Sequence, residues 1–142
     1  MAEEASQVVQ GDGYAVGHID AMGDRYGFRK IRRELGVTAF GINAVCMPAG
    51  YESGRHYHDE QEETYFVHQG TIEIEFADGS LHRLGPGGAA RVDAATVRQL
   101  RNAGDGDAVY LCAGGKDGYV GRDGRLPGGD EPTGRQGPPG AA

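Results

Sequence analysis

Two histidines and one glutamate in the first half of the chain have the types and spacing of metal ligands. His56 and His58 are two residues apart, so on a β-strand both imidazole rings project from the same face. Four residues of turn follow, and Glu63 then opens the next expected strand. If that strand returns beside the first, the three side chains form a facial set of N, N and O ligands with open positions opposite. Such a set suits a divalent transition metal.

The same segment also has a simpler interpretation. It is dense in carboxylates, and paired histidines beside an acidic turn are often solvated. Asp59, Glu60 and Glu62 are most simply such a turn, with Glu62 the competitor of Glu63 as a ligand. Spacing alone therefore leaves two alternatives, a metal site or a wet acidic loop between two strands.

Short strands must position these side chains, because the composition favours turns over helices. The chain has 26 glycines in 142 residues and no tryptophan, and its length fits one domain. Residues 38–50 and 71–80 each alternate apolar with other side chains and end at turn residues, which predicts strands. Residues 28–35 fit either a strand or a single helical turn. We therefore expect an all-β domain.

Composition divides the chain into three parts. Residues 1–13 are polar, so we expect a flexible N-terminal arm, either loose or ordered as a strand against a partner subunit. Residues 14–118 contain the train of strands. Residues 119–142 are dominated by Gly, Pro and charge, with little apolar surface to offset the entropy of ordering them. For this last part we expect a disordered Gly/Pro-rich tail without chemistry.

Five positions match the first motif of the cupin superfamily at that family's spacing: Gly50, His56, His58, Glu63 and Gly70. The chain therefore resembles a small single-domain cupin over about residues 37–113. The resemblance implies that residues 14–118 form an antiparallel cupin-type β-barrel, also described as a double-stranded β-helix or RmlC-like jelly roll. It further implies a homodimer and a site inside the mouth of the barrel.

The second cupin motif is degenerate in this chain. Laid on Gly88, the motif brings Ala94, Thr96 and Gln99 to its Pro, Gly and His positions, while Asn102 falls one residue early. The family usually supplies its fourth protein ligand at the position of Gln99. Three interpretations stay open: a fourth ligand through the amide oxygen, a hydrogen-bond donor to bound water or substrate, or a filler in a barrel that has lost its metal.

Other side chains are expected to line the site through the period-two rule. Tyr65 shares the face of Glu63 and either binds substrate or packs in the core. Arg101 shares the face of Gln99 and either holds a substrate carboxylate or points to water at the strand end. Arg91 and Arg98 are expected at the surface.

The resemblance implies a metal-binding protein that acts on a small oxygen-bearing molecule. We expect His56, His58 and Glu63, with Gln99 as a further candidate, to hold Fe, Mn, Ni or Zn. The metal would serve a dioxygenase, an isomerase or a decarboxylase, since cupins host many reactions on one barrel. The alternative is a non-catalytic module that binds a small molecule.

Charge and composition argue against several partners. The net charge is −7 and basic residues are scattered, so we expect no nucleic acid. No signal peptide or apolar run of about 18 residues is present, so we expect a cytoplasmic protein without membrane contact. Cys46 and Cys112 are expected as buried thiols, with a disulfide as the alternative. The remaining histidines lack partners at ligand spacing and are expected to be structural or exposed: His18, His68 and His82.

Overall fold

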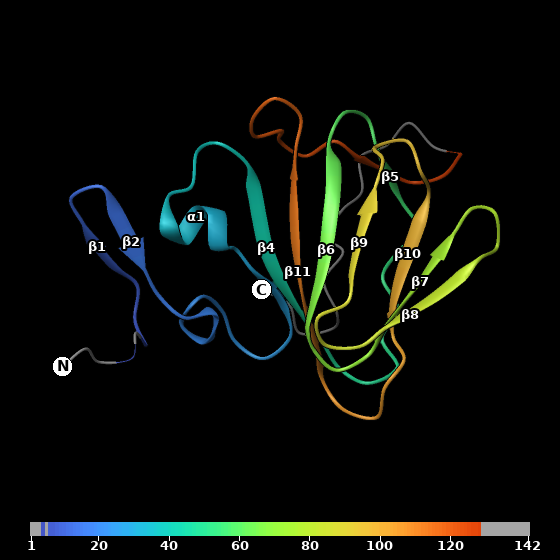
Figure 1. The fold of residues 1–142 in the computed structure, drawn as a ribbon, viewed down its shortest axis with the longest axis horizontal. Helices are drawn as coiled ribbons and strands as arrows, with labels where there is room; N and C mark the ends of the chain where they lie inside the picture. Colours follow the sequence, from blue (N-terminus) through green and yellow to red (C-terminus); the bar gives the residue numbers. More distant parts are fainter. Residues whose placement is uncertain (1–3, 5, 129–142) are drawn as a thin grey trace.

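The computed structural model describes residue 4 and residues 6–128 of the chain. Strands dominate it, and the helical elements among the described residues are one turn of 3-10 helix and one short α-helix (Figure 1). In chain order the elements are β1 (Val9–Gly11), β2 (Tyr14–Val16), η1 (Ile19–Ala21), β3 (Gly27–Arg29), α1 (Ile31–Leu35), β4 (Gly41–Met47), β5 (Tyr57–His58), β6 (Glu62–Gln69), β7 (Ile72–Phe76), β8 (Leu81–Leu84), β9 (Ala89–Val92), β10 (Arg98–Asn102), β11 (Ala108–Gly115) and β12 (Gly124–Arg125).

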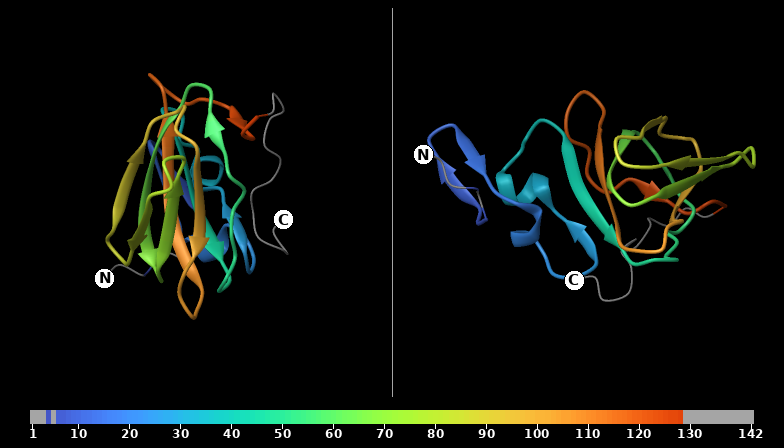
Figure 2. Two further views of the ribbon diagram at one scale, coloured as in Figure 1. Left: turned by 90° about the vertical axis from the view of Figure 1, so that its right-hand side faces the viewer. Right: turned by 60° about the horizontal axis from the view of Figure 1, so that its bottom comes forward.

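Two antiparallel sheets enclose the core. The larger has five strands in the order β3-β4-β11-β6-β9, and the smaller has three in the order β10-β7-β8. Figure 2 shows the sheets curling toward each other, with the β12-β5 pair beside them. This arrangement confirms the prediction of an all-β, double-stranded β-helix barrel.

Alternation along the strands builds the core. On β6, Glu63, Tyr65 and Val67 are buried while the residues between them are exposed, as the period of two requires. Ile72 and Ile74 on β7 are likewise buried, with the partly buried Glu73 between them. Together they join a single cluster of buried side chains: Val45, Met47, Tyr65, Val67, Ile72, Ile74, Val92, Leu100, Ala108 and Tyr110. Glu63 is therefore a carboxylate at the end of an otherwise apolar inward row.

Gly70, the last glycine of the first motif, is required by geometry. Its φ is +77°, in the left-handed region that favours glycine. A Cβ there would lie 2.8 Å from the carbonyl oxygen of Asp107 and 2.9 Å from the Cα of Ala108. The tight turn from β6 to β7 thus needs glycine, and it sets which residues of β6 face inward.

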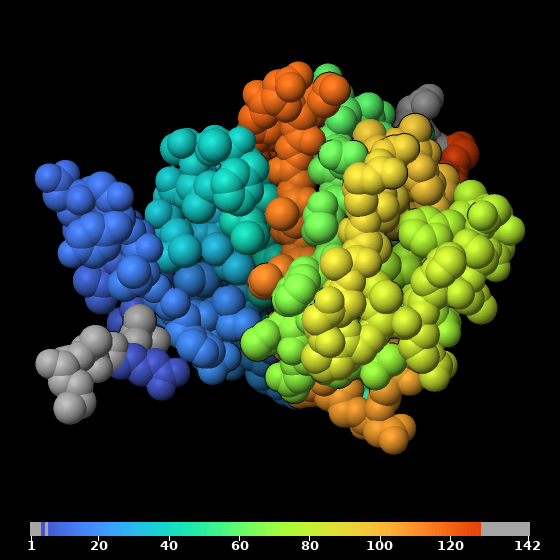
Figure 3. All heavy atoms as spheres, viewed as in Figure 1, coloured from blue at the N-terminus to red at the C-terminus, as the bar shows by residue number. Residues whose placement is uncertain are grey.

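The described part of the expected N-terminal arm contains one strand of a short hairpin. Val9–Gly11 pair with Tyr14–Val16 of the same chain to form the hairpin β1-β2, which projects from one side of the body (Figure 3). Residues 28–35 combine both alternatives, since they contain the end of β3 followed by the single turn of α1. Among the described residues, no helix has the length and apolar character needed to span a bilayer.

The prediction of a disordered tail from residue 119 is wrong for its first part. Gly124 and Arg125 form β12, which pairs with His58 and Tyr57 of β5, and Asp123 is only 8% exposed. The physical reason is that polar contacts rather than apolar burial order this segment. Residues 129–142 lie outside the described residues.

Candidate metal centre

The structure brings three predicted ligands together. One ligand atom from each of His56, His58 and Glu63 lies within 4.8 Å of the others. The two rings meet edge to face with centroids 5.2 Å apart. Backbone pairing holds them there, because His56 exchanges two hydrogen bonds of 2.9 Å with Arg98, and the amide of His58 donates to the carbonyl of Ala94 at 2.7 Å.

Each histidine has its Nδ1 fixed by an acceptor. The Nδ1 of His56 lies 3.2 Å from the carbonyl oxygen of Gly54, and the Nδ1 of His58 lies 2.8 Å from the Asp123 carboxylate. Neither oxygen can donate, so both Nδ1 atoms carry the proton. The Nε2 of each neutral ring is then a lone pair available to a metal ion, an arrangement that metalloproteins use to orient their ligands.

Asp123 ties three parts of the site together and was not predicted. Besides His58, its carboxylate accepts hydrogen bonds from the backbone amides of Glu60 at 2.8 Å and Gln61 at 3.0 Å, and from the Gln61 side chain at 2.6 Å. Burial alone would raise the pKa of Asp123, but these donors and His58 outweigh it and lower the pKa to about 2. Asp123 is therefore a permanent anion behind His58.

Glu63 is held ionised by three neighbours. Its Oε1 accepts from the hydroxyl of Tyr65 at 2.6 Å and from the guanidinium of Arg98 at 2.9 Å, while its Oε2 accepts from the thiol of Cys112 at 3.1 Å. Burial alone would raise the pKa of Glu63, but His58, Arg98 and Tyr65 lower it well below its usual range. A carboxylate in this state suits ligation better than proton transfer.

The contact between His58 and Glu63 supports the presence of a cation at the site. The Nε2 of His58 lies 3.1 Å from Oε1 of Glu63, but its orientation satisfies no hydrogen bond, and it stays a buried polar atom without a partner. Burial lowers the pKa of His58, and the two carboxylates overcome that effect and raise it. Either a proton or a metal ion beside Nε2 would relieve the repulsion between lone pairs. The donor set therefore fits a divalent metal.

Arg98 is buried, and the prediction that it lies at the surface is wrong. Its side chain is 0% exposed, and Nη1 donates to the carbonyls of Asp93, Ala94 and Thr96 while Nε donates to the Tyr65 hydroxyl. Shifting the second motif by one residue puts Arg98 at its His position and Asn102 at its Asn position. The early Asn102 was the signal for this register, and its amide binds the carbonyls of Met47 and Gly106.

The same one-residue shift removes Gln99 and Arg101 from the candidate site. Arg98, Leu100 and Asn102 are the buried residues of β10, so the side chains between them face the other way. The amide of Gln99 donates to the carbonyl of Ser53 at 2.8 Å. Arg101 forms ion pairs with three carboxylates on that outer face: Glu52, Glu73 and Glu75. The structure brings neither residue to the cluster.

The remaining predicted residues lie close to where they were expected. Tyr65 shares the inward face of Glu63 and is 3% exposed, although its hydroxyl is occupied by Glu63 and Arg98. Glu62 faces outward and pairs with Arg91, with both side chains more than half exposed, which leaves Glu63 as the ligand candidate. Cys46 and Cys112 are free thiols. Three histidines lie apart from the cluster and are exposed: His18, His68 and His82.

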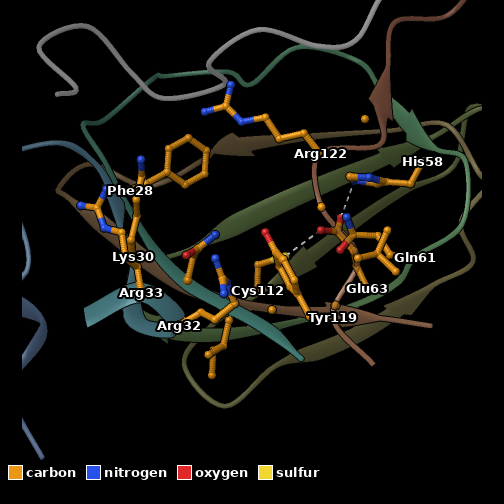
Figure 4. Close-up of a pocket in the computed structure, with 17 residues that line it drawn as sticks. Phe28, Lys30, Arg32, Arg33, His58, Gln61, Glu63, Cys112, Tyr119 and Arg122 are labelled. Atoms are coloured by element: carbon orange, nitrogen blue, oxygen red, sulfur yellow. Dashed lines mark hydrogen bonds and ion pairs between the residues drawn. The ribbon is translucent and has the colours of Figure 1, made fainter. Parts of the chain in front are cut away.

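An open cleft of about 380 Å³ leads to this cluster. His58, Gln61 and Glu63 lie together at one end of it, and a hydrogen bond joins Cys112 to Glu63 (Figure 4). Residues 119–122 and 124 form part of its wall. The segment expected to be a tail thus shapes the access to the candidate metal centre.

Comparison with known proteins agrees with this geometry. The model of the Cupin domain family matches residues 43–114, just over half of the chain. A sugar phosphate isomerase of the cupin superfamily from Silicibacter pomeroyi is 28% identical in sequence, over 74% of this chain and 60% of its own, with a TM-score of 0.58. The DMSP lyase DddQ from Ruegeria pomeroyi is 25% identical, over 66% of this chain and 45% of its own, with a TM-score of 0.56.

A cupin protein from Bacteroides fragilis is 26% identical, over 68% of this chain and 82% of its own, with a TM-score of 0.59. No curated protein matches the sequence. The chain spans only 60% and 45% of the isomerase and the lyase, so the similarity covers part of each of these proteins.

Proposed function

Because the chain belongs to the cupin domain family, we propose that it is a metal-dependent enzyme acting on a small oxygen-bearing molecule. The observation that carries this proposal is the cluster of His56, His58 and Glu63, with three ligand atoms within 4.8 Å. In their neutral forms both histidines offer Nε2 as a ligand atom, and Glu63 is ionised. Three protein ligands would leave coordination positions open for a substrate.

The protein's own groups would hold and orient the metal. His56, His58 and Glu63 supply the donors, and Gly54 and Asp123 fix the two rings through Nδ1. Bound Fe(II), Mn(II), Ni(II) or Zn(II) supplies Lewis acidity at a substrate carbonyl or hydroxyl oxygen. Tyr65 and Arg98 hold the carboxylate of Glu63 in place. Tyr65 has no spare hydroxyl proton for a substrate, so we assign it a positioning role.

We propose isomerase-type or lyase-type chemistry ahead of oxygenation. A sugar phosphate isomerase and a DMSP lyase are among the similar proteins whose names state a reaction, and isomerisation and elimination can both proceed by acidifying a C–H bond beside an oxygen function. A Lewis acid suits this requirement. Oxygenase activity is the competing expectation, and it would require O₂ consumption and a redox-active metal.

Metal content tests the proposal directly. The untagged protein, purified without chelator and under argon, should contain about one equivalent of a transition metal per chain by elemental mass spectrometry, since the described residues hold one such set of ligands. His58→Ala should lose the metal, while the matched control His82→Ala, an exposed residue outside the cluster, should keep it. Equal metal affinity in the wild type and His58→Ala would refute the site.

A second candidate function, a non-catalytic binding module, is favoured by one observation. The guanidinium of Arg98 already neutralises Glu63 at 2.9 Å, so the carboxylate is satisfied without a metal. Proton NMR in D₂O separates the two functions. An isomerase or lyase should exchange a C–H proton or convert a member of a panel of hydroxy acids, keto acids and sugar phosphates, whereas a binding module should leave every member unchanged.

Assembly and location stay proposals. We propose a homodimer, as the family resemblance implies, and a location in the cytoplasm. Sedimentation velocity should give the mass of two chains of 15.0 kDa each. A monomer at micromolar concentration would contradict the dimer.

A further inference from the structure

The cleft beside the metal centre has an unusual balance of charge. Four of the fourteen Lys and Arg residues of the chain line it, against one of the twenty-one Asp and Glu residues. Three basic residues come from the β3–α1 segment and one from the segment before β12. We call these four the basic end of the cleft: Lys30, Arg32, Arg33 and Arg122. In a chain of net charge −7, this local excess is the reverse of the overall balance.

Figure 4 shows how the charges are distributed along the cleft. Lys30, Arg32 and Arg33 lie together on one side, and Arg122 lies above the cleft between them and His58. His58 and Glu63 lie on the opposite side. Among the described residues, the single lining carboxylate belongs to Glu63, which is paired with the buried Arg98. On the described lining of the cleft, basic side chains therefore outnumber acidic ones by four to one.

The three arginines of the basic end differ from most other arginines in their pairing. Arg32 and Arg122 form no ion pair with a carboxylate in residues 6–128. Arg33 contacts its sequence neighbour Glu34 at 3.5 Å, with 63% of the arginine side chain exposed, which is a weak pair. By contrast, while Arg25 and Arg29 have no carboxylate within ion-pair distance in the described part of the chain, six other arginines outside the cleft do: Arg55, Arg83, Arg91, Arg98, Arg101 and Arg125.

A further contact positions Arg32. Its guanidinium carbon lies 3.9 Å from the centre of the Tyr119 ring, a cation–π contact that holds the charge against the cleft wall. Stacking occupies the face of a guanidinium and leaves its N–H groups able to donate. Gathering Arg32, Arg33 and Arg122 in one cleft raises the electrostatic energy of the free protein, and an anion that binds there would lower it.

We propose that this cleft binds a small organic anion whose phosphate or carboxylate group lies at the basic end while its other end reaches His58 and Glu63. The volume of about 380 Å³ is within the range of small-ligand pockets. The inference deepens the proposed function, and rests on it, because it names the substrate class of the same site. The shared chemistry is an oxyanion recognised by guanidinium and ammonium groups.

Titration calorimetry with inorganic phosphate and with acetate tests this inference. Each probe is titrated into metal-free, full-length protein at fixed ionic strength, because screening by salt changes such contacts. The wild type should bind at least one probe saturably. Tighter phosphate binding would indicate a phosphorylated substrate and tighter acetate binding a carboxylate. Absence of saturable binding of both probes would overturn the proposal.

Charge variants locate the binding. Arg33→Ala combined with Arg122→Ala should weaken the preferred probe by roughly tenfold or more, because two charge-assisted contacts are lost. Both residues are exposed, so folding should persist, and thermal melting checks this. The matched control Arg83→Ala removes an exposed arginine outside the cleft and should change nothing. Arg33→Lys with Arg122→Lys retains both charges and should restore most of the affinity.

Two further measurements separate this inference from the proposed function. The metal content of the double Ala variant should equal that of the wild type, and His58→Ala should lose metal while still binding the probe. If metal binds but the probe affinity is the same in the wild type and the double variant, the anion site is wrong and the metal centre stands. If the probe binds and no metal does, the anion site stands and the metal-dependent function falls.

Discussion

Residues 56–63 and residues 119–125 build one site from opposite kinds of sequence. The first segment has a compact pattern of histidine and carboxylate that can be recognised by its spacing. The second has glycine and charge, and it lacks the apolar alternation that predicts a strand. The two segments nevertheless pair as β5 and β12, and His58 and Asp123 meet at 2.8 Å. The candidate ligands thus form a local sequence pattern, while a group that orients one of them, Asp123, comes from a distant part of the chain.

The second segment is ordered by polar contacts. Asp123 accepts four hydrogen bonds from His58, Glu60 and Gln61, and Arg125 pairs with Asp59 at 2.8 Å. Arg32 stacks on the ring of Tyr119. A criterion for disorder that counts apolar side chains misses such a network, because each bond depends on a partner distant in sequence.

Removal of the chain after Gly118 should have the largest effect, and it tests whether residues 119–125 contribute to the metal site. A chain that ends at Gly118 loses Asp123, β12 and part of the cleft wall, so its affinity for Zn(II) or Mn(II) should fall by roughly 100-fold or more, beyond the loss from one orienting group. A chain that ends at Gly128 keeps all these contacts and serves as the control. Equal metal affinity in the two chains would show that residues 119–125 contribute nothing to the site.

The carboxylate of Asp123 should account for much of the metal affinity that the truncated chain loses. Asp123→Asn keeps the size of the side chain but removes the charge behind His58, so metal affinity should fall by roughly 10- to 100-fold. The exposed Asp105 offers a matched control, since Asp105→Asn removes a charge far from the cluster in sequence and contacts. Competition with a chromophoric chelator measures both. A loss of the same size in the two variants would point to a general charge effect.

Arg98 extends the comparison to β10, where a cation stands at the fourth-ligand position. Arg98→His removes a positive charge beside Glu63 and adds an imidazole, so metal affinity should rise by about tenfold or more, which corresponds to about 1.4 kcal/mol. Arg98→Met removes the charge without adding a donor and separates the two effects. If Arg98→His binds metal more weakly than the wild type, position 98 does not face the metal.

The smallest effects should come from two glutamines that differ in their contacts. Gln61→Ala removes a 2.6 Å hydrogen bond to Asp123 and should weaken metal binding by roughly three- to tenfold, the effect of one lost bond to a charged group. Gln99→Ala removes a bond to the carbonyl of Ser53 and should stay within about twofold of the wild type. A larger loss for Gln99→Ala would return that residue to the ligand set.

The amino-acid sequence by itself determined the all-β fold and the three ligand candidates. Alternation identifies strands because side chains on a strand alternate between its faces. His56, His58 and Glu63 fall within eight consecutive positions, so one turn and one strand pairing bring them together. Each of these features depends on residues close together in the chain.

Only the tertiary structure decided which more distant residues complete the site. A shift of one residue on β10 moved Arg98 to the centre and Gln99 and Arg101 to the outer face, because neighbouring side chains on a strand point in opposite directions. The pairing of β12 with β5 brought Asp123 to a histidine 65 positions earlier. The basic end of the cleft joins α1 to the segment before β12. The register of β10, the contact of Asp123 with His58 and the basic end of the cleft all depend on pairing between distant segments. A local sequence pattern does not predict such pairing.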